Sequence, residues 1–498
     1  MITGAVIFFQ IGRKNASLFP VQAFKHPYDS FKQSMMPHLR HTQLNPARLF
    51  IFSFLGLVFI GTLMLKLPHS TRDGISFIDA LFTSTSAVCI TGLTVMNTSS
   101  DFTIFGQTVI MLLIQSGALG ILTFASYFSY FFKGGSSYET QIVMSSISNT
   151  EKIGDVFKTL KRILIITISI ELIGAAFIYG SLNPALIPSI PDRIFFSAFH
   201  AVSAFCNAGF STLQNGIMET GYVTNYPFQL SLIFLFFLGG LGFPIVINII
   251  KYLKHRLKTI FLRFTYGRKD GHKPWIMTLG SRINLMTTFS LIIIGFTLIF
   301  LGEYDNVLTP HQGIGKFVTA LFTSTVSRTA GFNTIDYNQL HIHSIMLIMF
   351  LMWIGGSPVS TAGGIKTSTF AIAVLNFANL ARNKSKIEIY NREIANISIR
   401  RAFATIMLAL LAIGMGVTLI SIFDKNIPIL QIVFECVSAY GTVGLSLGIT
   451  TKLSIASKVV ICVLMFVGRI TFLTVLIALF KRVKYTSYAY PSEEILIN

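Results

Sequence analysis

Charged residues are scarce in this chain of 498 residues. They make up 12% of it, against about a quarter in a typical soluble domain, while 52% of the residues are hydrophobic and the mean hydropathy is +0.66. This composition excludes a soluble globular protein. Acidic residues are especially few, with 20 Asp and Glu against 39 Lys and Arg, so the formal net charge is +19. Such an excess of positive charge raises the question of a nucleic-acid partner.

Cysteines are few as well, and none are paired in the sequence. No two have CxxC spacing, and all lie in apolar surroundings, so nothing indicates a disulfide framework or a zinc site. We interpret them as small buried side chains. The four are Cys89, Cys206, Cys436 and Cys462.

Catalytic motifs are absent too. The chain has no HExxH, GxSxG or P-loop motif and no paired catalytic carboxylates, which argues against a membrane enzyme. His200, His341 and His343 do not form a convincing metal cluster, and we interpret them as surface histidines. We therefore expect no cofactor bound by this chain.

Long apolar runs are what the sequence has instead. Runs of about 20 residues, the length that crosses a bilayer core, occur eight times. Between the members of each successive pair lies a shorter apolar stretch that ends in a glycine-containing segment, too short to span and too hydrophobic for an ordinary loop. We interpret these stretches as re-entrant helices of an all-α polytopic membrane protein. The predicted spans are residues 48–66, 103–132, 162–180, 226–250, 282–302, 342–372, 401–423 and 456–480.

The basic residues outside the spans are concentrated on one predicted side. Of the 39 basic residues 29, and of the 20 acids nine, lie in the arm 1–47 with Arg48, the tail 481–498 and the three long linkers between pairs of spans, 133–162, 251–282 and 382–401. That side therefore carries +20 and everything else −1. This is the positive-inside pattern, so we expect both termini in the cytoplasm and no nucleic-acid role. The N-terminal arm lacks a convincing signal-peptide core and is expected to be retained.

A repeat recurs through the chain, centred on a glycine. Gly92, Gly209, Gly331 and Gly444 are 117, 122 and 113 residues apart, and a Phe precedes each by ten residues, or by nine in the third case. Four span–loop–span units that enter from the same side can close a ring with pseudo-fourfold symmetry, so that the loops converge on one axis. The expected units are residues 48–132, 162–250, 282–372 and 401–480.

Glycines at such a convergence suit an ion pathway. Backbone carbonyls can replace the water shell of an ion where the chain adopts conformations that side chains disfavour. The C-terminal ends of the preceding short helices would also favour a cation. The alternative is that these glycines serve only close helix packing.

The residues at these loops resemble the Trk/Ktr/HKT superfamily of potassium transporters, and most closely the membrane subunit of a Ktr-type system. The resemblance covers about residues 48–485. The motifs that carry it are Thr-Gly-Leu at 91–93, Asn-Ala-Gly-Phe at 207–210, Ser-Arg-Thr-Ala-Gly-Phe-Asn-Thr at 327–334, Gly-Thr-Val-Gly-Leu-Ser at 441–446, and the stretches 239–244, 355–366 and 468–469.

The resemblance implies potassium uptake across a bacterial plasma membrane through one filter per subunit, in a homodimer that a cytosolic nucleotide-binding ring protein regulates. Glycine at all four filter positions favours potassium over sodium, and sodium remains a candidate coupling or activating ion. The implied filter residues are Ile90, Thr91, Gly92, Asn207, Ala208, Gly209, Thr329, Ala330, Gly331, Thr442, Val443 and Gly444.

The sixth span is interrupted by glycines and a proline, so a continuous helix is improbable and the segment should face the pore. The resemblance implies an intramembrane gate here, and the alternative is a kink that eases packing. Arg469 within the last span would oppose this gate as a positive barrier, or pair with a carboxylate. The implied gate residues are Gly355, Gly356, Ser357, Pro358, Ser360, Thr361, Gly363, Gly364, Lys366 and Arg469.

Other charged and polar residues leave alternatives open. Lys366 either lines the inner vestibule or bonds to the gate loop. Arg328 points away from the axis and braces its short helix, with Glu171, Glu303 or Glu435 as candidate partners. These carboxylates are either structural or part of an outer cation site.

The 251–282 linker, Asn207 and the residues after Arg469 also leave alternatives open. The 251–282 linker, with nine basic residues against one acid, sets orientation and contacts anionic lipid, although an acidic partner face is the other candidate. Asn207 either contributes a side-chain oxygen to the filter or caps its helix. The relatives usually continue with Gly-Pro after the arginine at 469, where this chain has Ile470-Thr471, so the local helix geometry is open there.

The leading hypothesis is thus a potassium-translocating subunit. The alternative is a secondary transporter for another cation or a small solute, with broken helices at the midplane. Such folds commonly show inverted repeats, whereas these loops repeat in one orientation.

Overall fold

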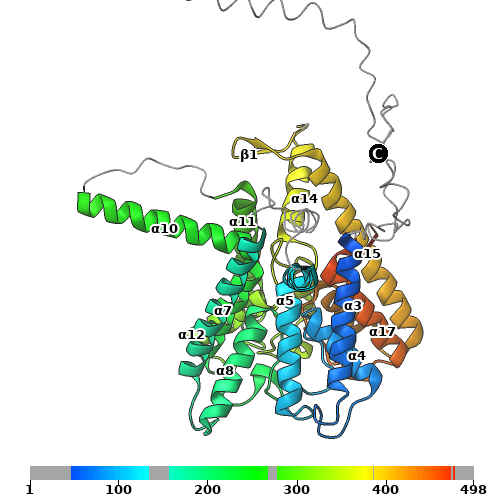
Figure 1. Cartoon of the computed structure of the whole chain (residues 1–498). Coiled ribbons are helices and arrows are strands. Elements are labelled where there is room, and N and C mark those ends of the chain that lie inside the picture. Colours follow the sequence, from blue (N-terminus) through cyan, green and yellow to red (C-terminus); the bar gives the residue numbers. More distant parts are fainter. Residues whose placement is uncertain (1–45, 134–155, 267–276, 385, 473–474, 477–498) are drawn as a thin grey trace, which may run out of the picture. The chain divides into compact units, whose positions relative to one another are not determined.

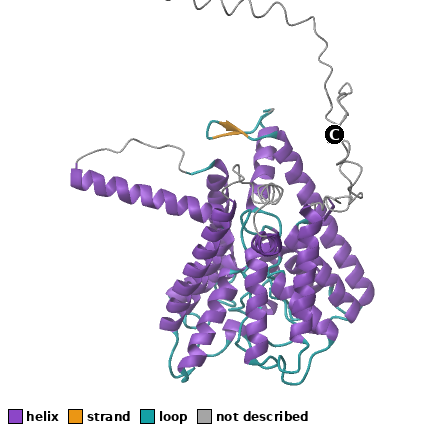
Figure 2. Cartoon of the chain, in the orientation of Figure 1, coloured by secondary structure: helices purple, strands orange, loops and turns teal. Residues whose placement is uncertain are grey.

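The computed structural model describes residues 46–133, 156–266, 277–384, 386–472 and 475–476. The predicted arm 1–47 lies outside these residues except for its last two, and the predicted tail 481–498 lies outside them entirely. Nearly all described secondary structure is helical, with one short pair of strands (Figure 2).

The first predicted unit contains a long helix, a short helix and a second long helix. Ser76 caps the short helix by accepting a hydrogen bond from the backbone N–H of Asp79 (3.1 Å). The second long helix is interrupted at Gly120, whose φ of 65° is not helical. The three are α3 (Pro46–Leu65), α4 (Phe77–Val88) and α5 (Ile104–Lys133).

The second unit departs from its predicted span. Residues 226–250 do not form one helix, because Gly242 has φ +83° and the chain bends there by 105° (Figure 1). The helix after the bend runs into the predicted 251–282 linker, which is therefore helical in its first half. The elements are α7 (Val156–Ser181), α8 (Ile190–Phe205), η2 (Gly216–Met218), α9 (Tyr226–Leu241) and α10 (Phe243–Tyr266).

In the third unit, the predicted interruption of the sixth span is present as 13 residues without helix between two helices, residues 354–366, which we call the gate-loop segment. Ile354 and Ile365, at its two ends, form an isolated parallel bridge. The elements are α11 (Leu279–Gly302), α12 (Ile314–Val326), η3 (Tyr337–Gln339), α13 (Ile342–Trp353) and α14 (Thr367–Leu380).

The fourth unit follows a short antiparallel hairpin in the predicted 382–401 linker. Its last helix ends at Ile470, because Thr471 has φ +74°, so the predicted span 456–480 is not continuous. The elements are β1 (Glu388–Ile389), β2 (Arg392–Glu393), α15 (Asn396–Phe423), α16 (Ile429–Gly441), η4 (Thr450–Lys452) and α17 (Ile455–Ile470).

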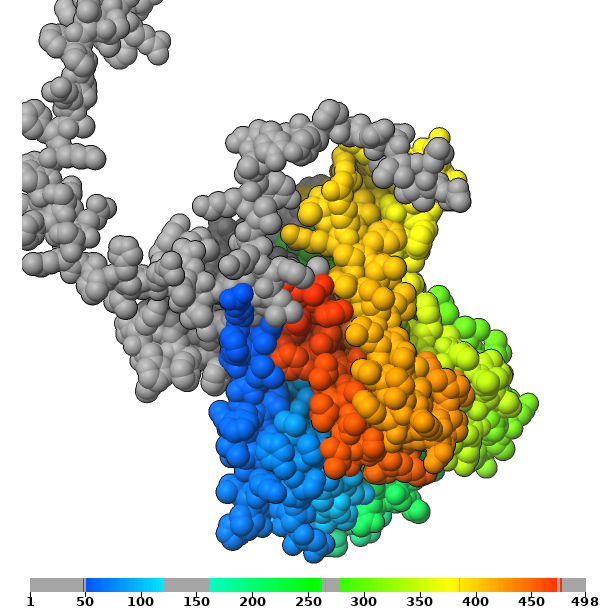
Figure 3. Space-filling model, turned by 90° about the vertical axis from the view of Figure 1, so that its right-hand side faces the viewer, coloured from blue at the N-terminus to red at the C-terminus, as the bar shows by residue number. Residues whose placement is uncertain are grey.

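The short helices α4, α8, α12 and α16 lie at the centre of the packing. Each contacts helices of its own unit and one helix of a neighbouring unit: α4 meets α17, α8 meets α5, α12 meets α9 and α16 meets α13. The first and last units therefore meet, and the rings of Phe54 in α3 and Phe466 in α17 are 6.2 Å apart. Figure 3 shows α3, α17 and α15 beside one another on one face.

The outer helices expose apolar side chains, as lipid-facing helices do. Among the described residues, three segments are long and apolar enough to cross a membrane, and the bent pair α9–α10 would be a fourth. Only 22–28% of the best apolar window of each of the three is buried. The predicted total of eight spans stays a prediction. The three segments are Lys161–Ser181, Leu279–Gly302 and Asn396–Phe423.

Candidate functional site

The short helices α4, α8, α12 and α16 each run into a loop with an unusual backbone. Two residues before the repeat glycine, a non-glycine residue has positive φ, and the glycine itself has positive φ as well. This alternation is strained for residues with a side chain, and it recurs at all four places. The non-glycine residues are Ile90, Asn207, Thr329 and Thr442, with φ of 59°, 61°, 77° and 50°.

The four glycines meet. A Cβ built on Gly92 would collide with the carbonyl oxygen of Ala208, and one on Gly209 would lie 2.8 Å from the Cα of Gly331. One on Gly331 would lie 2.5 Å from the carbonyl oxygen of Val443, and one on Gly444 would collide with that of Thr91. The contacts thus run from each loop to the next along the chain and close from the last to the first.

Serine side chains of the short helices fix the backbone of three of these loops through hydrogen bonds. The backbone N–H of Gly92 donates to Ser86 Oγ and that of Gly444 to Ser438 Oγ, both at 3.1 Å. In the second loop Ser203 Oγ donates instead to the carbonyl of Phe210 (2.7 Å). Each serine stands six residues before its glycine. Sequence reasoning did not single these serines out, although the aligned repeats already contained that spacing.

The third loop is one residue tighter than the others. The N–H groups of Thr91, Ala208 and Val443 donate to carbonyls five residues back, whereas that of Ala330 donates to Val326, four residues back. This explains why its Phe-to-Gly spacing is nine residues and not ten. Despite the shorter turn, Gly331 reaches the same ring of contacts.

Asn207 caps its helix. Its amide satisfies its neighbours when the nitrogen donates to the carbonyls of Ala204 (3.2 Å), Phe205 (3.3 Å) and Phe236 (3.1 Å), and the oxygen accepts from Thr329 Oγ1 (3.2 Å). The side chain therefore links the second loop to the third. Of the two roles predicted for it, the geometry favours the cap.

A cavity of about 360 Å³ opens on one side of the glycine ring. All four repeat glycines line it, and so do Ser446 and Thr450. Both hydroxyls donate to the buried carboxylate of Glu435, at 2.7 Å for Ser446. Glu435 therefore holds the loop after the fourth glycine and does not project into the cavity as a cation ligand. We call this opening the glycine cavity.

The gate-loop segment is held against the loops' other side. A Cβ on Gly363 would collide with Thr442 Oγ1, so the segment touches the fourth loop directly. Thr361 Oγ1 donates to the carbonyl of Phe205 (3.3 Å), at the end of α8. The N–H of Ser357 donates to the carbonyl of Gly240 (2.9 Å). The segment is therefore held by contacts with the second and fourth units beside the glycine ring.

Three cations hold this arrangement through backbone carbonyls, and of these Arg328 is buried while Lys366 and Arg469 are partly buried. Arg469 donates to the carbonyls of Thr361 in the segment and Gly117 in α5 (3.1 Å). Lys366 donates to the carbonyl of Ala362 (2.5 Å), which favours the second of its two predicted roles. Among the described residues, no carboxylate pairs with Arg469.

Arg328 likewise binds carbonyls, those of Thr288 in α11 (3.3 Å) and Gly355 in the segment (3.1 Å). The predicted carboxylate partners are engaged elsewhere. Glu171 accepts from Gln115 Nε2 (3.1 Å), and Glu303 from Asn306 Nδ2 (2.7 Å). The prediction that Arg328 braces its helix fits these contacts, but its partners are backbone oxygens.

Three further glycines allow the long helices to approach the ends of the short ones. A Cβ on Gly117, Gly239 or Gly468 would collide with the carbonyl oxygen of Val88, Phe205 or Tyr440. The latter two glycines belong to motifs that the sequence analysis recognised, whereas Gly117 was missed. Its signal was a glycine in the second long helix of the unit, as in the other two cases.

Comparison with known proteins shows to which family this chain belongs. The family model of TrkH, described as cation transport protein, matches residues 46–488. The chain belongs to the TrkH family of cation transport proteins. A transporter family, and not an enzyme family, therefore accounts for nearly the whole chain.

The relatives of this TrkH-family chain include two with long, nearly complete matches. The Ktr system potassium uptake protein B of Bacillus subtilis is 34% identical over 461 residues, covering 92% of this chain and 98% of the relative. The potassium/sodium uptake protein NtpJ of Enterococcus hirae is 36% identical over 467 residues, covering 91% and 98%.

The fold also has a solved counterpart. The crystal structure of the potassium transporter TrkH from Vibrio parahaemolyticus superposes with a TM-score of 0.67, covering 88% of this chain and 86% of that one. The two sequences are 18% identical, so this likeness concerns the fold alone. The helical membrane-transporter fold expected from the sequence is thereby confirmed.

Proposed function

We propose that this chain takes up potassium through a filter formed by its four glycine loops, arranged with pseudo-fourfold symmetry. The observation that carries the proposal is the closed ring of glycine contacts. Thr91, Ala208 and Val443 stand just before three of the glycines, and the carbonyl oxygen of each lies beside the glycine of the preceding loop in the ring. Such oxygens can replace the hydration shell of potassium.

The short helices add to the attraction. Four helix C-termini end at the ring, and each carries a partial negative charge that favours a cation there. The names of two relatives, potassium uptake protein B and potassium/sodium uptake protein, support potassium as the principal ion. Sodium remains the candidate coupling or activating ion.

The gate-loop segment is proposed to control passage beneath this filter. It touches Thr442 of the fourth loop and donates a hydrogen bond to the carbonyl of Phe205 at the end of α8, so we place it across the path between the ring and the opposite side. Arg469 holds it closed by binding two carbonyls at once, and its positive charge is a barrier to cations.

Partners follow from the relatives. The Bacillus subtilis relative is described as a protein of a Ktr system, and we infer that this chain likewise works with a cytosolic nucleotide-binding ring subunit, as a homodimer. We also infer residence in a bacterial plasma membrane with both termini in the cytoplasm, on the charge asymmetry. The glycine cavity then opens to the outside.

Helix α10 supports the inferred contact with anionic lipid. Leu253, Leu257 and Phe261 are exposed at four-residue spacing along one stripe of the helix, and Lys251, Lys254 and Lys258 are exposed along a stripe beside it. This is the pattern of a helix that lies in the membrane interface. The chain bends by 105° between α9 and α10, and a helix that lies along the membrane interface must turn in this way from one that enters the membrane.

Complementation tests the function directly. In a bacterial strain without its own potassium uptake systems, we expect this chain to restore growth at low potassium, more strongly with a ring subunit coexpressed. Saturable uptake of an organic solute without cation flux would instead support the secondary-transporter alternative.

A further inference from the structure

Two segments far apart in the sequence meet on the side where the glycine cavity opens. Glu303 follows the last residue of α11, and its side chain is fully buried. His341 precedes α13 and His343 stands in its first turn, and both side chains are exposed. One ligand atom from each of these three residues lies within 4.8 Å of the others.

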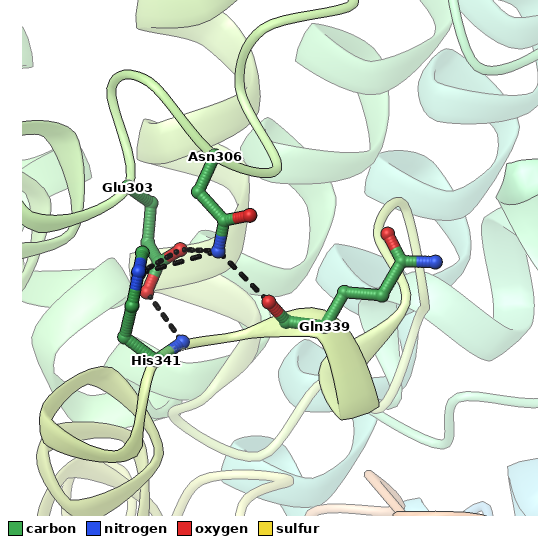
Figure 4. A network of polar contacts seen from close by, with 4 residues as sticks. All are labelled: Glu303, Asn306, Gln339 and His341. Atoms are coloured by element: carbon green, nitrogen blue, oxygen red, sulfur yellow. Dashed lines mark hydrogen bonds and ion pairs between the residues drawn. The ribbon is translucent and has the colours of Figure 1, made fainter.

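The carboxylate of Glu303 is fixed in place (Figure 4). Its Oε1 accepts from the backbone N–H of His341 (3.0 Å), and its Oε2 accepts from Asn306 Nδ2 (2.7 Å) and lies 3.2 Å from His341 Nδ1. Asn306 is itself held by the carbonyl of Gln339 (2.8 Å). A buried carboxylate held in this way is oriented toward the imidazoles by the fold.

The second imidazole also faces this end of α11. The rings of His341 and His343 stack with centroids 5.3 Å apart and an interplanar angle of 15°. A Cβ built on Gly302 would lie 2.8 Å from His343 Nε2, so this nitrogen lies beside the residue that precedes Glu303. Glycine at 302 leaves the room that the ring occupies.

We propose that Glu303, His341 and His343 bind a divalent transition-metal ion, with Zn²⁺ the best match. Two imidazole nitrogens and one carboxylate oxygen form a donor set that zinc prefers, and a water molecule would complete four-coordination. His341 Nδ1 and Glu303 Oε2, 3.2 Å apart, already have about the separation of two ligands around a tetrahedral zinc ion. The exposed ring of His343 can rotate to close the remaining distance.

Metal binding would place positive charge beside the buried side chain of Glu303. It would also tie the end of α11 to the start of α13, the helix that leads into the gate-loop segment. The proposal revises the expectation that the histidines are unrelated surface residues. The prediction of a surface histidine is wrong for His200, because its ring is buried between the carbonyl of Phe196 and Ser211 Oγ, and it is not part of the cluster.

The competing explanation is a simple hydrogen bond or ion pair between His341 and Glu303. That explanation needs no His343, whereas a metal site does. His343→Gln therefore separates the two, and it leaves the bonds of Glu303 intact. His69→Gln is the matched control, because His69 is an exposed histidine in the loop between α3 and α4.

The experiment titrates Zn²⁺ into the purified, tag-free full chain in detergent, against a chromophoric chelator. Because losing even an outer hydrogen-bond partner costs about 10–100-fold in metal affinity, losing a ligand should weaken the tightest site by at least about tenfold. We expect this for His343→Gln and His341→Gln and not for His69→Gln. Co²⁺ in the same site should give the visible absorption of a tetrahedral complex, absent in His343→Gln.

Equal zinc affinity in the wild-type chain and His343→Gln would overturn the proposal. So would an equal loss in His69→Gln. Neither result depends on ion transport, so failure here would leave the potassium proposal untouched.

Discussion

At the residue scale, the side chains with most influence on this pathway are those that bind backbone. Ser86 and Ser438 hold the N–H groups of two repeat glycines, and Arg469 holds a carbonyl of the gate-loop segment. Each contact leaves the polar backbone of a non-helical stretch satisfied at membrane depth. The side chains therefore act on the pathway by fixing where carbonyl oxygens point.

Arg469→Gln is expected to raise passive potassium flux in liposomes. Hydrogen bonds to a charged group contribute about 1.5–3 kcal/mol each, and a loss of about 1.4 kcal/mol from the closed state raises the open population about tenfold. Arg469→Lys tests how the arginine acts, because lysine keeps the charge but cannot bridge Thr361 and Gly117. We expect a leak with lysine too.

Arg400→Gln, at an exposed arginine near the start of α15, serves as the control and should leave the flux unchanged. Wild-type flux in Arg469→Gln would show that the two carbonyl contacts do not hold the segment closed.

At the element scale, the sequence predicted the short helices and the interrupted sixth span but not α10 or the bend before it. The spacing of the repeat glycines located the loops, since that signal is local and periodic. The sequence predicts a span up to residue 250 and a linker after it, because the many basic residues beyond 250 lower the hydropathy, although Leu253, Leu257 and Phe261 are spaced for one helical face. The bend depends on a single positive φ at Gly242, which composition does not reveal.

Contacts between distant elements were also beyond the sequence. The carbonyl partners of Arg328 and Arg469 could not be predicted, because backbone oxygens carry no residue-specific signal. The cluster of Glu303 with His341 was missed for a related reason. The two residues are 38 positions apart, and only the fold brings the end of α11 to the start of α13.

Deleting Gly363 and Gly364 should open the pathway. The deletion removes the part of the gate-loop segment that touches Thr442 and Gly441, so the segment can no longer lie against the fourth loop. We expect a higher passive potassium flux in liposomes. Gly414→Ala in α15, where an added Cβ meets nothing within 4 Å, is a control for glycine replacement in general. A deletion variant that folds but shows no added flux would mean that the interruption only eases packing.

At the scale of the whole molecule, the chain closes on itself. The last helix, α17, packs against α4 of the first unit, and Lys458 Nζ lies 2.8 Å from Asp79 Oδ1 across that contact. The glycine contacts follow the same order and close in the same place. Closure is what makes one central path from four loops, and so it is the architectural basis of the proposed filter.

The most direct test of this account compares potassium and sodium flux through the purified chain in liposomes, for the wild type, Gly92→Ser and Gly444→Ser. Gly74→Ser is the matched control, because Gly74 has a similar φ of +83° against +89° at Gly92, yet an added Cβ there meets nothing within 4 Å. Backbone strain is thus comparable, and only the filter variants push a side chain into the ring.

We expect the potassium-over-sodium ratio to fall about tenfold in Gly92→Ser and Gly444→Ser, which corresponds to ~1.4 kcal/mol, and to stay at the wild-type value in Gly74→Ser. An unchanged ratio in both filter variants, with flux retained, would contradict the assignment of the four glycine loops as the selectivity filter.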